Sequence, residues 1–316
     1  MNSLNSQYEV FLLFIKKYLR SGRKEVLEKI NKHKNISFPS WHIGMMNDSS
    51  RNQFYRTEIG NQAKGKNVLD LGAGFGFLTW VALESGAKHV YALEENPFIV
   101  TILEDLFADE ISNGRVTLLS MHSSLLNSSH FKRGQPDLIV HEIFGNTGLS
   151  EWVIDIFEDL FNRKVLTPEM SFLPNRFSIH CCAHYSTFIN RNYQFLNPEM
   201  RNKFQKIESL MTLMHPSVSL PYGQEGDASS PYELLNIDLN QFEPRKESEL
   251  KIVLQKEANC LRVWFNFYGN SECFSSDQKL NPGNHWANQF YSLDLTGKTT
   301  DLKVTYNGGE LYFKNQ

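Results

Sequence analysis

The chain has 316 residues, of which 41% are hydrophobic and 21% are charged, as is typical of a soluble globular protein with a sizeable core. A formal net charge of -3 provides no basic field for a nucleic-acid partner, and four cysteines are too few for a disulfide scaffold, which favours a reducing cytoplasm. No apolar run approaches the roughly 20 residues that cross a bilayer, so we expect no membrane association.

The N-terminal part reads as helical. Apolar residues recur at helical spacing over 5–33, which predicts two helices. The pattern breaks around Pro39, and 42–65 is predicted to be a further helix that leads into the first strand. The apolar run Val10–Ile15 is short and lacks a small-residue cleavage site, so it is not expected to be a signal peptide.

From 66 to about 180, strand and helix patterns alternate, which predicts a parallel sheet covered by helices. Helices are expected at Phe77–Ser85 and from Pro97, where proline suits a first helical position. The expected strands are Val68–Leu71, Val90–Leu93, Val116–Leu119, Leu138–Val140 and Phe172–His180.

Beyond 180 the pattern changes to a helix followed by strands. Asn197-Pro198 predicts the start of a helix that carries an apolar stripe from Met200 to Met214. Asn307-Gly308-Gly309 predicts a closing hairpin, so the C-terminal part should be an antiparallel sheet or barrel. Its expected strands are Leu234–Leu239, Leu250–Leu254, Leu261–Tyr268, Phe290–Leu295 and Leu302–Tyr306.

A glycine-rich turn indicates a nucleotide-like cofactor. Gly72, Gly74 and Gly76 follow the first strand where it enters a helix, and glycines there let a ligand approach the backbone. Glu94 ends the next strand, where a carboxylate can accept hydrogen bonds from both ribose hydroxyls. A dinucleotide fingerprint would need a third glycine at position 77, which is Phe77, so NAD is disfavoured. A purely structural turn is the alternative.

Two glutamates flank a loop that contains glycines. Glu142 comes just after the strand Leu138–Val140, and Glu151 follows Gly145 and Gly148. Two carboxylates can hold the five-donor fork of a guanidinium in one orientation, which would leave one nitrogen freer to react. The alternative for Glu151 is that it merely caps the following helix.

These features resemble four motifs of the protein arginine N-methyltransferases, over roughly 41–295. Glu142 and Glu151 stand nine positions apart, as in the "double-E" loop of that family. The other matches are Val68–Thr79 with Gly86–Glu94 for the glycine turn and its following strand, Asn284-His285-Trp286 for a Thr-His-Trp loop, and Trp41–Asn52 for the segment that closes over the cofactor.

The resemblance implies S-adenosylmethionine as cofactor and a role for each matched residue. Arg51 would bind the carboxylate of the cofactor's methionine part, Glu94 the ribose, and Met45 would pack near the transferable methyl. Ser124 stands where the family often has a glutamate that contacts adenine. The implied cofactor-binding residues are Met45, Arg51, Asp70, Gly72, Gly74, Glu94 and Ser124.

On the substrate side, the resemblance implies Glu142, Glu151 and His285 as catalytic residues. His285 would pair with Asp48, and it would either take a proton or hold the shape of the site. Trp286 would line the arginine channel, and His42 belongs to the covering segment. The family's Tyr-Phe-x-x-Tyr element is absent, and Ile36–Trp41 stands in its neighbourhood.

The implied architecture is α/β, with a Rossmann-like methyltransferase lobe followed by a β-barrel lobe that carries a helical dimerisation arm. The expected parts are N-terminal helices at 1–40, the cofactor domain at 41–180, the substrate domain at 181–316 and an arm at about 185–225. We therefore expect a cytoplasmic homodimer.

Several alternatives stay open at this point. The substrate is expected to be arginine in a protein or peptide. The chain shows no zinc finger, SH3 domain or glycine-rich docking tail, so free arginine or a small guanidino compound is the alternative. A catalytically dead dimeric scaffold is a third. His180, Cys182 and His184 share a strand face that could ligate zinc, but we expect packing there and no metal.

Overall fold

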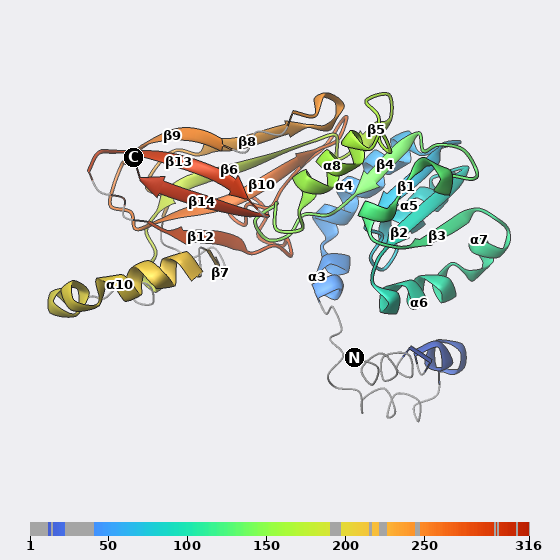
Figure 1. The fold of residues 1–316 in the computed structure, drawn as a ribbon, viewed down its shortest axis with the longest axis horizontal. Helices are drawn as coiled ribbons and strands as arrows, with labels where there is room; N and C mark the ends of the chain where they lie inside the picture. Colours follow the sequence, from blue (N-terminus) through green and yellow to red (C-terminus); the bar gives the residue numbers. More distant parts are fainter. Residues whose placement is uncertain are drawn as a thin grey trace. The chain divides into compact units, whose positions relative to one another are not determined.

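The computed structural model describes residues 12–13, 15–22, 41–189, 197–214, 217–220, 226–243, 247–293, 295, 297–307 and 309–315 (Figure 1). Within the predicted N-terminal helices, residues 12–13 and 15–21 are helical, and the rest of 1–40 lies outside the described residues. The chain forms two compact units. The first comprises 1–48, 52–142 and 159–173, and the second comprises 49–51, 143–158 and 174–316.

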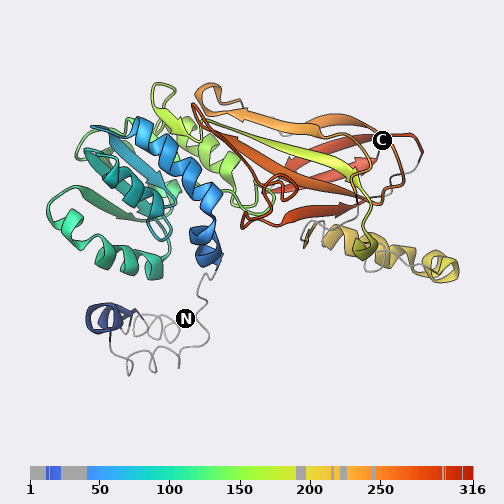
Figure 2. The ribbon, with the colours of Figure 1, turned by 180° about the vertical axis from the view of Figure 1, so that it is seen from behind.

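The first unit is built on a parallel sheet with the strand order β3-β2-β1-β4-β5. Its central strands are buried along their whole length, because helices cover both faces of such a sheet. Views from opposite sides each show helices in front of the sheet (Figures 1 and 2). The strands are β1 (Asn67–Leu71), β2 (His89–Glu94), β3 (Val116–Ser120), β4 (Leu138–His141) and β5 (Ser171–Leu173).

The helices begin and end largely where the sequence signals them. The Asn96 side chain accepts a hydrogen bond from the Phe98 N–H, and Pro97 occupies the first turn of its helix. The helical elements around this sheet are α3 (Trp41–Asn47), α4 (Ser49–Gln62), α5 (Phe77–Glu84), α6 (Pro97–Leu106), α7 (Ala108–Ser112), η1 (Ser123–Leu125), η2 (Ser128–His130) and α8 (Val153–Asn162).

The second unit contains two antiparallel sheets. One has the order β7-β12-β10-β6-β8, with β11 added to β10, and the other has the order β14-β13-β9. The elements are β6 (Arg176–His184), α10 (Pro198–Met214), β7 (Val218–Leu220), β8 (Tyr232–Asp238), η3 (Leu239–Gln241), β9 (Glu247–Val253), β10 (Cys260–Tyr268), β11 (Cys273–Ser275), β12 (Asn288–Ser292), β13 (Thr299–Asn307) and β14 (Glu310–Asn315).

These two units confirm the predicted α/β class, with a Rossmann-like lobe followed by a lobe of antiparallel sheets, whereas the closed barrel and the dimerisation role of the arm stay predictions. Two element predictions are wrong. The strand expected at Phe172–His180 is two strands in different sheets, because Pro174 has no N–H to continue the first ladder. The helix expected over 42–65 is two helices, which are separated at Asp48.

The predicted arm is described only in part. Residues 190–196, 215–216 and 221–225 lie outside the described residues, as do the side chains of Met211 and Met214. The helix α10 departs from helical geometry at Phe204, where φ is -111° and ψ is 17°. Met200 and Ile207 on this helix are exposed.

Within the described residues, no helix has the length and apolar composition that a membrane span requires.

Candidate functional site

The glycine turn after β1 is held against the end of β2. The N–H groups of Gly72 and Ala73 donate to the Leu93 carbonyl, at 3.1 and 2.8 Å. Gly74 and Gly76 adopt positive φ angles of 52° and 81°, which favour glycine. A Cβ at Gly76 would lie 2.5 Å from the Phe107 ring, so this glycine is required for packing.

Glu94 is the carboxylate that joins this turn to β2. Its Oε2 accepts the Gly74 N–H at 2.9 Å, and its Oε1 accepts the Asn96 N–H at 2.8 Å. The side chain is buried, so these bonds stabilise its charge. Each carboxylate oxygen keeps a further lone pair, and Glu94 can therefore also accept from a ribose hydroxyl.

The segment around α3 lies over the same turn. His42 is buried, and its ring packs at a tilt against the Phe75 ring, at a centroid distance of 4.6 Å. A Cβ on Gly74 would lie only 3.2 Å from His42 Nε2, so His42 limits the space above the turn. Met45 is half-buried, and its carbonyl accepts the Asp48 N–H at 3.2 Å. These contacts fit a segment that covers a bound cofactor.

Arg51 is buried on α4, with 1% of its surface exposed. Arg51 is therefore not an ordinary solvated charge on a helix. A guanidinium that leaves water needs anionic or other acceptor partners. Arg51 can consequently serve as a built-in anion-binding group.

Two other predicted cofactor residues occupy different surroundings. Asp70 is fully buried in β1 and accepts a hydrogen bond from the Thr79 hydroxyl at 2.7 Å, so it ties the strand to α5. Ser124 is exposed in η1, where its N–H donates to His122 Nδ1 at 3.1 Å. Asp70 thus supports the turn by linking β1 to α5. Ser124, in contrast, lies at the surface.

The loop from Ile143 to Glu151 is closed by contact with its own residues. A Cβ at Gly145 would lie 2.0 Å from Ser150 Oγ and 3.4 Å from Glu151 Cγ. Gly145 does not have a positive φ, so this contact, and not the backbone conformation, requires glycine. Glu151 is exposed at the end of the loop, and Glu142 precedes the loop at the end of β4.

Glycines also let the loop press against the antiparallel sheets. A Cβ at Gly148 would lie 2.8 Å from Phe265 Cβ, and one at Gly309 would lie 3.2 Å from the Leu149 carbonyl oxygen. The Tyr306 hydroxyl donates to the Asp155 carboxylate at the start of α8. Burial, together with this hydrogen bond, raises the pKa of Tyr306, so the phenol stays a donor.

Trp286 connects a second loop to the first. Its Nε1–H donates to the Phe144 carbonyl at 2.9 Å, and its ring packs edge-on against Phe265 at 5.1 Å. The indole is buried, and the His285 ring lies 3.8 Å from it and is half-buried. Trp286 therefore supports the Glu151 loop, a role that the sequence did not indicate. Its role as a channel wall stays a prediction.

The zinc alternative finds no support. His180 Nε2 lies 2.7 Å from Ser178 Oγ, and His184 Nδ1 donates to Asp227 at 3.1 Å. Burial raises the pKa of Cys182 to about 12, which disfavours the thiolate that a metal needs. No group of three or more His, Cys, Asp or Glu side chains in the described part of the chain could hold a metal ion.

The structure thus gathers one group of predicted residues around the glycine turn and another around the Glu151 loop. Residues 49–51 and 143–158 are assigned to the second unit, whereas Asp48 and Glu142 belong to the first. The pairing of Asp48 with His285 and the joint action of Glu142 with Glu151 stay predictions. The packing residues Ser150 and Phe144 were missed, because they carry no chemical signature in the sequence.

Comparison with known proteins finds relatives that are named arginine N-methyltransferases. No protein-family model matches the chain. An arginine N(omega)-methyltransferase from Streptomyces achromogenes subsp. streptozoticus is 26% identical over 279 residues, which are 85% of this chain and 76% of that protein. Protein arginine N-methyltransferase 9 from Xenopus laevis is 23% identical over 81% of this chain. The chain spans only 34% of that second relative.

A solved structure shows the same fold. The solved chain belongs to the Trypanosoma brucei PRMT1 enzyme–prozyme heterotetrameric complex with AdoHcy. It superimposes with a TM-score of 0.69 and 18% identity, over 86% of this chain and 90% of the solved chain.

Proposed function

We propose that this chain is a member of the protein arginine N-methyltransferase family and that it transfers a methyl group from S-adenosylmethionine to a guanidino nitrogen of arginine, as its similarity to proteins of that name supports. The observation that carries the proposal is the loop between Glu142 and Glu151. Its closure requires a glycine at position 145, and the spacing of its two carboxylates matches the family. Such a loop is suited to hold a guanidinium.

The chemistry asks the protein mainly for positioning and charge. Arginine is a poor nucleophile, because its nitrogen lone pairs are delocalised and it stays protonated in water. Glu142 and Glu151 bind the guanidinium and concentrate positive charge on the nitrogens that they contact, so the remaining nitrogen is freer to attack. When bound, S-adenosylmethionine would supply a methyl group on a sulfonium sulfur, which leaves as a neutral thioether. Alignment of the attacking nitrogen with that group supplies much of the rate.

The cofactor is held by the residues around the glycine turn. Glu94 accepts from the ribose with the lone pairs that its two backbone hydrogen bonds leave available. Arg51, a buried cation, would bind the carboxylate of the methionine part. The remaining assigned residues are Met45 near the methyl, Ser124 near the adenine, and Asp70, Gly72 and Gly74 around the turn.

On the substrate side, His285 pairs with Asp48 and acts either as a proton acceptor or by holding the shape of the site. His42 covers the cofactor turn, where its ring packs at a tilt against the Phe75 ring. Trp286 lines the arginine channel in addition to its contact with the Phe144 carbonyl.

The substrate is arginine in a protein or peptide in our first proposal, as in relatives named protein arginine N-methyltransferases. A second candidate is free arginine. One observation favours it, since the relative that aligns with 85% of this chain is named for arginine itself. Free arginine requires partners for its α-carboxylate and α-amine, whereas a peptide requires an open groove, so the two designs are hard to combine in one site.

The assembly and location are proposed on the family pattern. The arm at about 185–225 joins two chains into a homodimer, and the exposed Met200 and Ile207 on α10 are suited to such a contact. We place the enzyme in the cytoplasm, in accord with its cysteine content. The parts at 1–40, 41–180 and 181–316 are proposed as N-terminal helices, cofactor domain and substrate domain.

One experiment tests the reaction and separates the two substrates. The protein is incubated with labelled S-adenosylmethionine and with free arginine or an arginine peptide, and the labelled product is identified by mass spectrometry. We expect a methylated guanidino group, with a higher kcat/KM for the peptide. A free-arginine kcat/KM at least about a hundredfold higher would establish the second candidate. Absence of methylation of every arginine substrate would reject the proposed reaction.

A further inference from the structure

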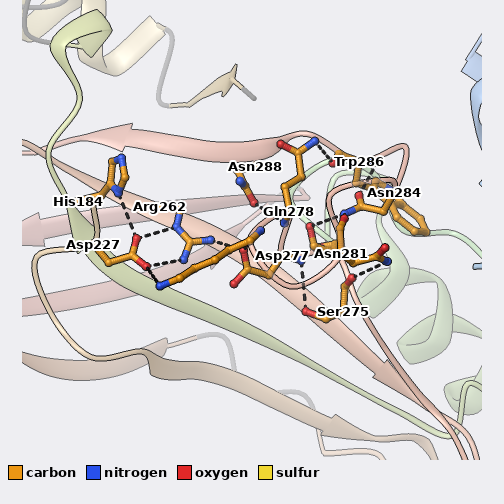
Figure 3. Close-up of polar contacts among 12 residues, drawn as sticks. His184, Asp227, Arg262, Ser275, Asp277, Gln278, Asn281, Asn284, Trp286 and Asn288 are labelled. Atoms are coloured by element: carbon orange, nitrogen blue, oxygen red, sulfur yellow. Dashed lines mark hydrogen bonds and ion pairs between the residues drawn. The ribbon is translucent and has the colours of Figure 1, made fainter. Parts of the chain in front are cut away.

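A buried cation that the proposed reaction does not use lies on β10. Arg262 has 1% of its side chain exposed and lies between two carboxylates (Figure 3). Its Nε and Nη2 donate to the two oxygens of Asp227, both at 3.0 Å, and its Nη1 donates to Asp277 Oδ1 at 2.5 Å. The guanidinium also stacks over the Trp264 ring at 4.4 Å. Fork-shaped donation of this kind fixes the positions of both carboxylates.

Asp277 begins the loop that carries the His285-Trp286 pair. Its Oδ1 also accepts the Lys279 N–H at 3.0 Å, and its carbonyl accepts the N–H groups of Leu280 and Asn281, at 2.9 and 2.8 Å. The buried Asp277 carboxylate therefore sets the first turn of the loop. Without Arg262, it would be a buried charge that lacks its cationic partner, which folded proteins avoid.

Hydrogen bonds carry this order along the loop to Trp286. Asn284 Nδ2 donates to the carbonyls of Ser276 and Asn281, at 3.2 and 2.6 Å, and its Oδ1 accepts the Trp286 N–H at 2.9 Å (Figure 3). Gln278 Nε2 donates to the Trp286 carbonyl at 3.0 Å. The Trp286 side chain then donates to the Phe144 carbonyl, inside the loop that ends at Glu151.

We propose that Arg262 and Asp277 are positioning residues, which fix the 277–286 loop and, through the bond from Trp286 to Phe144, the backbone next to Glu151. They act on the methyl-transfer site without touching substrate or cofactor. The link to catalysis rests on the proposed function, whereas the mechanical link between the two loops does not.

Asp227 provides a matched comparison. It binds the same guanidinium as Asp277 and is also largely buried, with 13% of its side chain exposed, but its other partners include His184 Nδ1 at 3.1 Å. It reaches the loop through Lys279 Nζ at 3.1 Å, and that amine is half exposed, so the contact is weak. Asp227→Ala and Asp277→Ala each remove one carboxylate from Arg262, but only the second removes the anchor of the loop.

Hydrogen exchange measured by mass spectrometry tests the mechanical link without any substrate. In Asp277→Ala, we expect exchange to accelerate by about tenfold or more over both 277–286 and 143–151, whereas Asp227→Ala leaves 143–151 unchanged. Equal acceleration in both variants, or none over 143–151 in Asp277→Ala, would overturn the proposal. If Asp277→Ala fails to fold, Asp277→Asn, which keeps an acceptor for the Lys279 N–H, replaces it.

Kinetics test the catalytic consequence. We expect Asp277→Ala and Arg262→Lys each to lower kcat by about tenfold, with an unchanged Kd for S-adenosylhomocysteine. The double variant should lose about tenfold and not a hundredfold, because both residues act through one anchor. Lys279→Met should keep the wild-type kcat. A hundredfold loss of kcat in the double variant, or a tenfold loss in Asp227→Ala, would contradict the proposal. If the wild-type protein transferred no methyl group, the proposed function would be rejected. The hydrogen-exchange result would still decide whether the two loops are mechanically linked.

Discussion

At the scale of single residues, the two glutamates that flank the 143–150 loop differ in their surroundings. Glu142 is half-buried at the end of β4, whereas Glu151 is exposed and lies against Gly145. If both bind the guanidinium, loss of either charge should impair the reaction while the glycine turn keeps its geometry. The cofactor and substrate contributions are therefore separable by experiment.

We predict that Glu142→Gln and Glu151→Gln each lower kcat by about a hundredfold or more, as for loss of a positioned charge in an active site. Calorimetric titration with S-adenosylhomocysteine should give an unchanged Kd in both variants. The matched substitution of a proposed cofactor-binding residue, Glu94→Gln, should instead raise the Kd for S-adenosylhomocysteine. A glutamine variant with near wild-type turnover would remove its glutamate from the clamp.

Gly145 allows a test in which only packing changes. Alanine there would meet Ser150 Oγ at 2.0 Å, so the loop next to Glu151 has to shift. We predict that Gly145→Ala destabilises the fold by about 1–3 kcal/mol, as overpacking does, and lowers kcat. The second substitution Ser150→Gly removes the obstructing atoms and should restore much of both losses.

Gly60→Ala is the control for this comparison. Gly60 is exposed on α4 and nothing lies within 4 Å of a Cβ built on it. Alanine favours a helix over glycine by about 1 kcal/mol, so this variant should be slightly more stable and fully active. If Gly145→Ala behaved in the same way in chemical denaturation and turnover assays, the loop would not be closed as described.

At the scale of elements, the helix α10 exposes two of its described apolar side chains. Ile207 has 47% of its side chain exposed, and Met200 has 44%. We predict that Ile207→Glu converts the proposed dimer to a monomer in light scattering and lowers activity with it, because a buried charge is unfavourable at an apolar contact. The neighbouring exposed Gln205→Glu should leave the dimer intact. If the wild-type protein is monomeric at micromolar concentration, the proposed dimerisation through the arm is wrong.

Strand patterns reveal where sequence reasoning succeeds and where it stops. The parallel strands were predictable because both of their faces are buried, so they read as continuous apolar runs. The β10 sequence Leu-Arg-Val-Trp-Phe-Asn-Phe-Tyr alternates, which is typical of a strand with one solvated face. Arg262 is nevertheless buried, because Asp227 and Asp277, distant in sequence, fold over it. Such pairing leaves no local signal.

The candidate site shows the same division. Its glycine turn, Glu94 and the two loop glutamates could be proposed from the sequence, because each residue type has a distinct chemistry at a fixed spacing. The carbonyl of Phe144 and the hydroxyl of Ser150 were not predictable, because any residue has a carbonyl and serine is common at surfaces. Their importance arises only from tertiary contact.

At the scale of the whole molecule, pH should act on stability through buried histidine. His89 is 3% exposed on β2, and its Nδ1–H donates to the Gly114 carbonyl at 2.9 Å. Its Nε2 lies 3.0 Å from the Thr117 hydroxyl, which can donate to a neutral imidazole. Burial lowers the pKa of His89 from 6.5, although the bond to Gly114 opposes this shift. The folded state therefore favours the neutral ring.

The sign of the effect follows from proton linkage. Between the lowered pKa of the folded chain and pH 6.5, the unfolded chain binds a proton at His89 that the folded chain does not, so the free energy of unfolding falls as the pH is lowered. The contribution is complete above the unfolded pKa and is lost as the pH falls through the lowered folded pKa. We predict that urea unfolding, followed by circular dichroism between pH 7.5 and about 5, shows this decline. His89→Gln should reduce its slope, whereas the exposed His122→Gln should not. An identical slope in wild type and His89→Gln would mean that His89 titrates alike in both states.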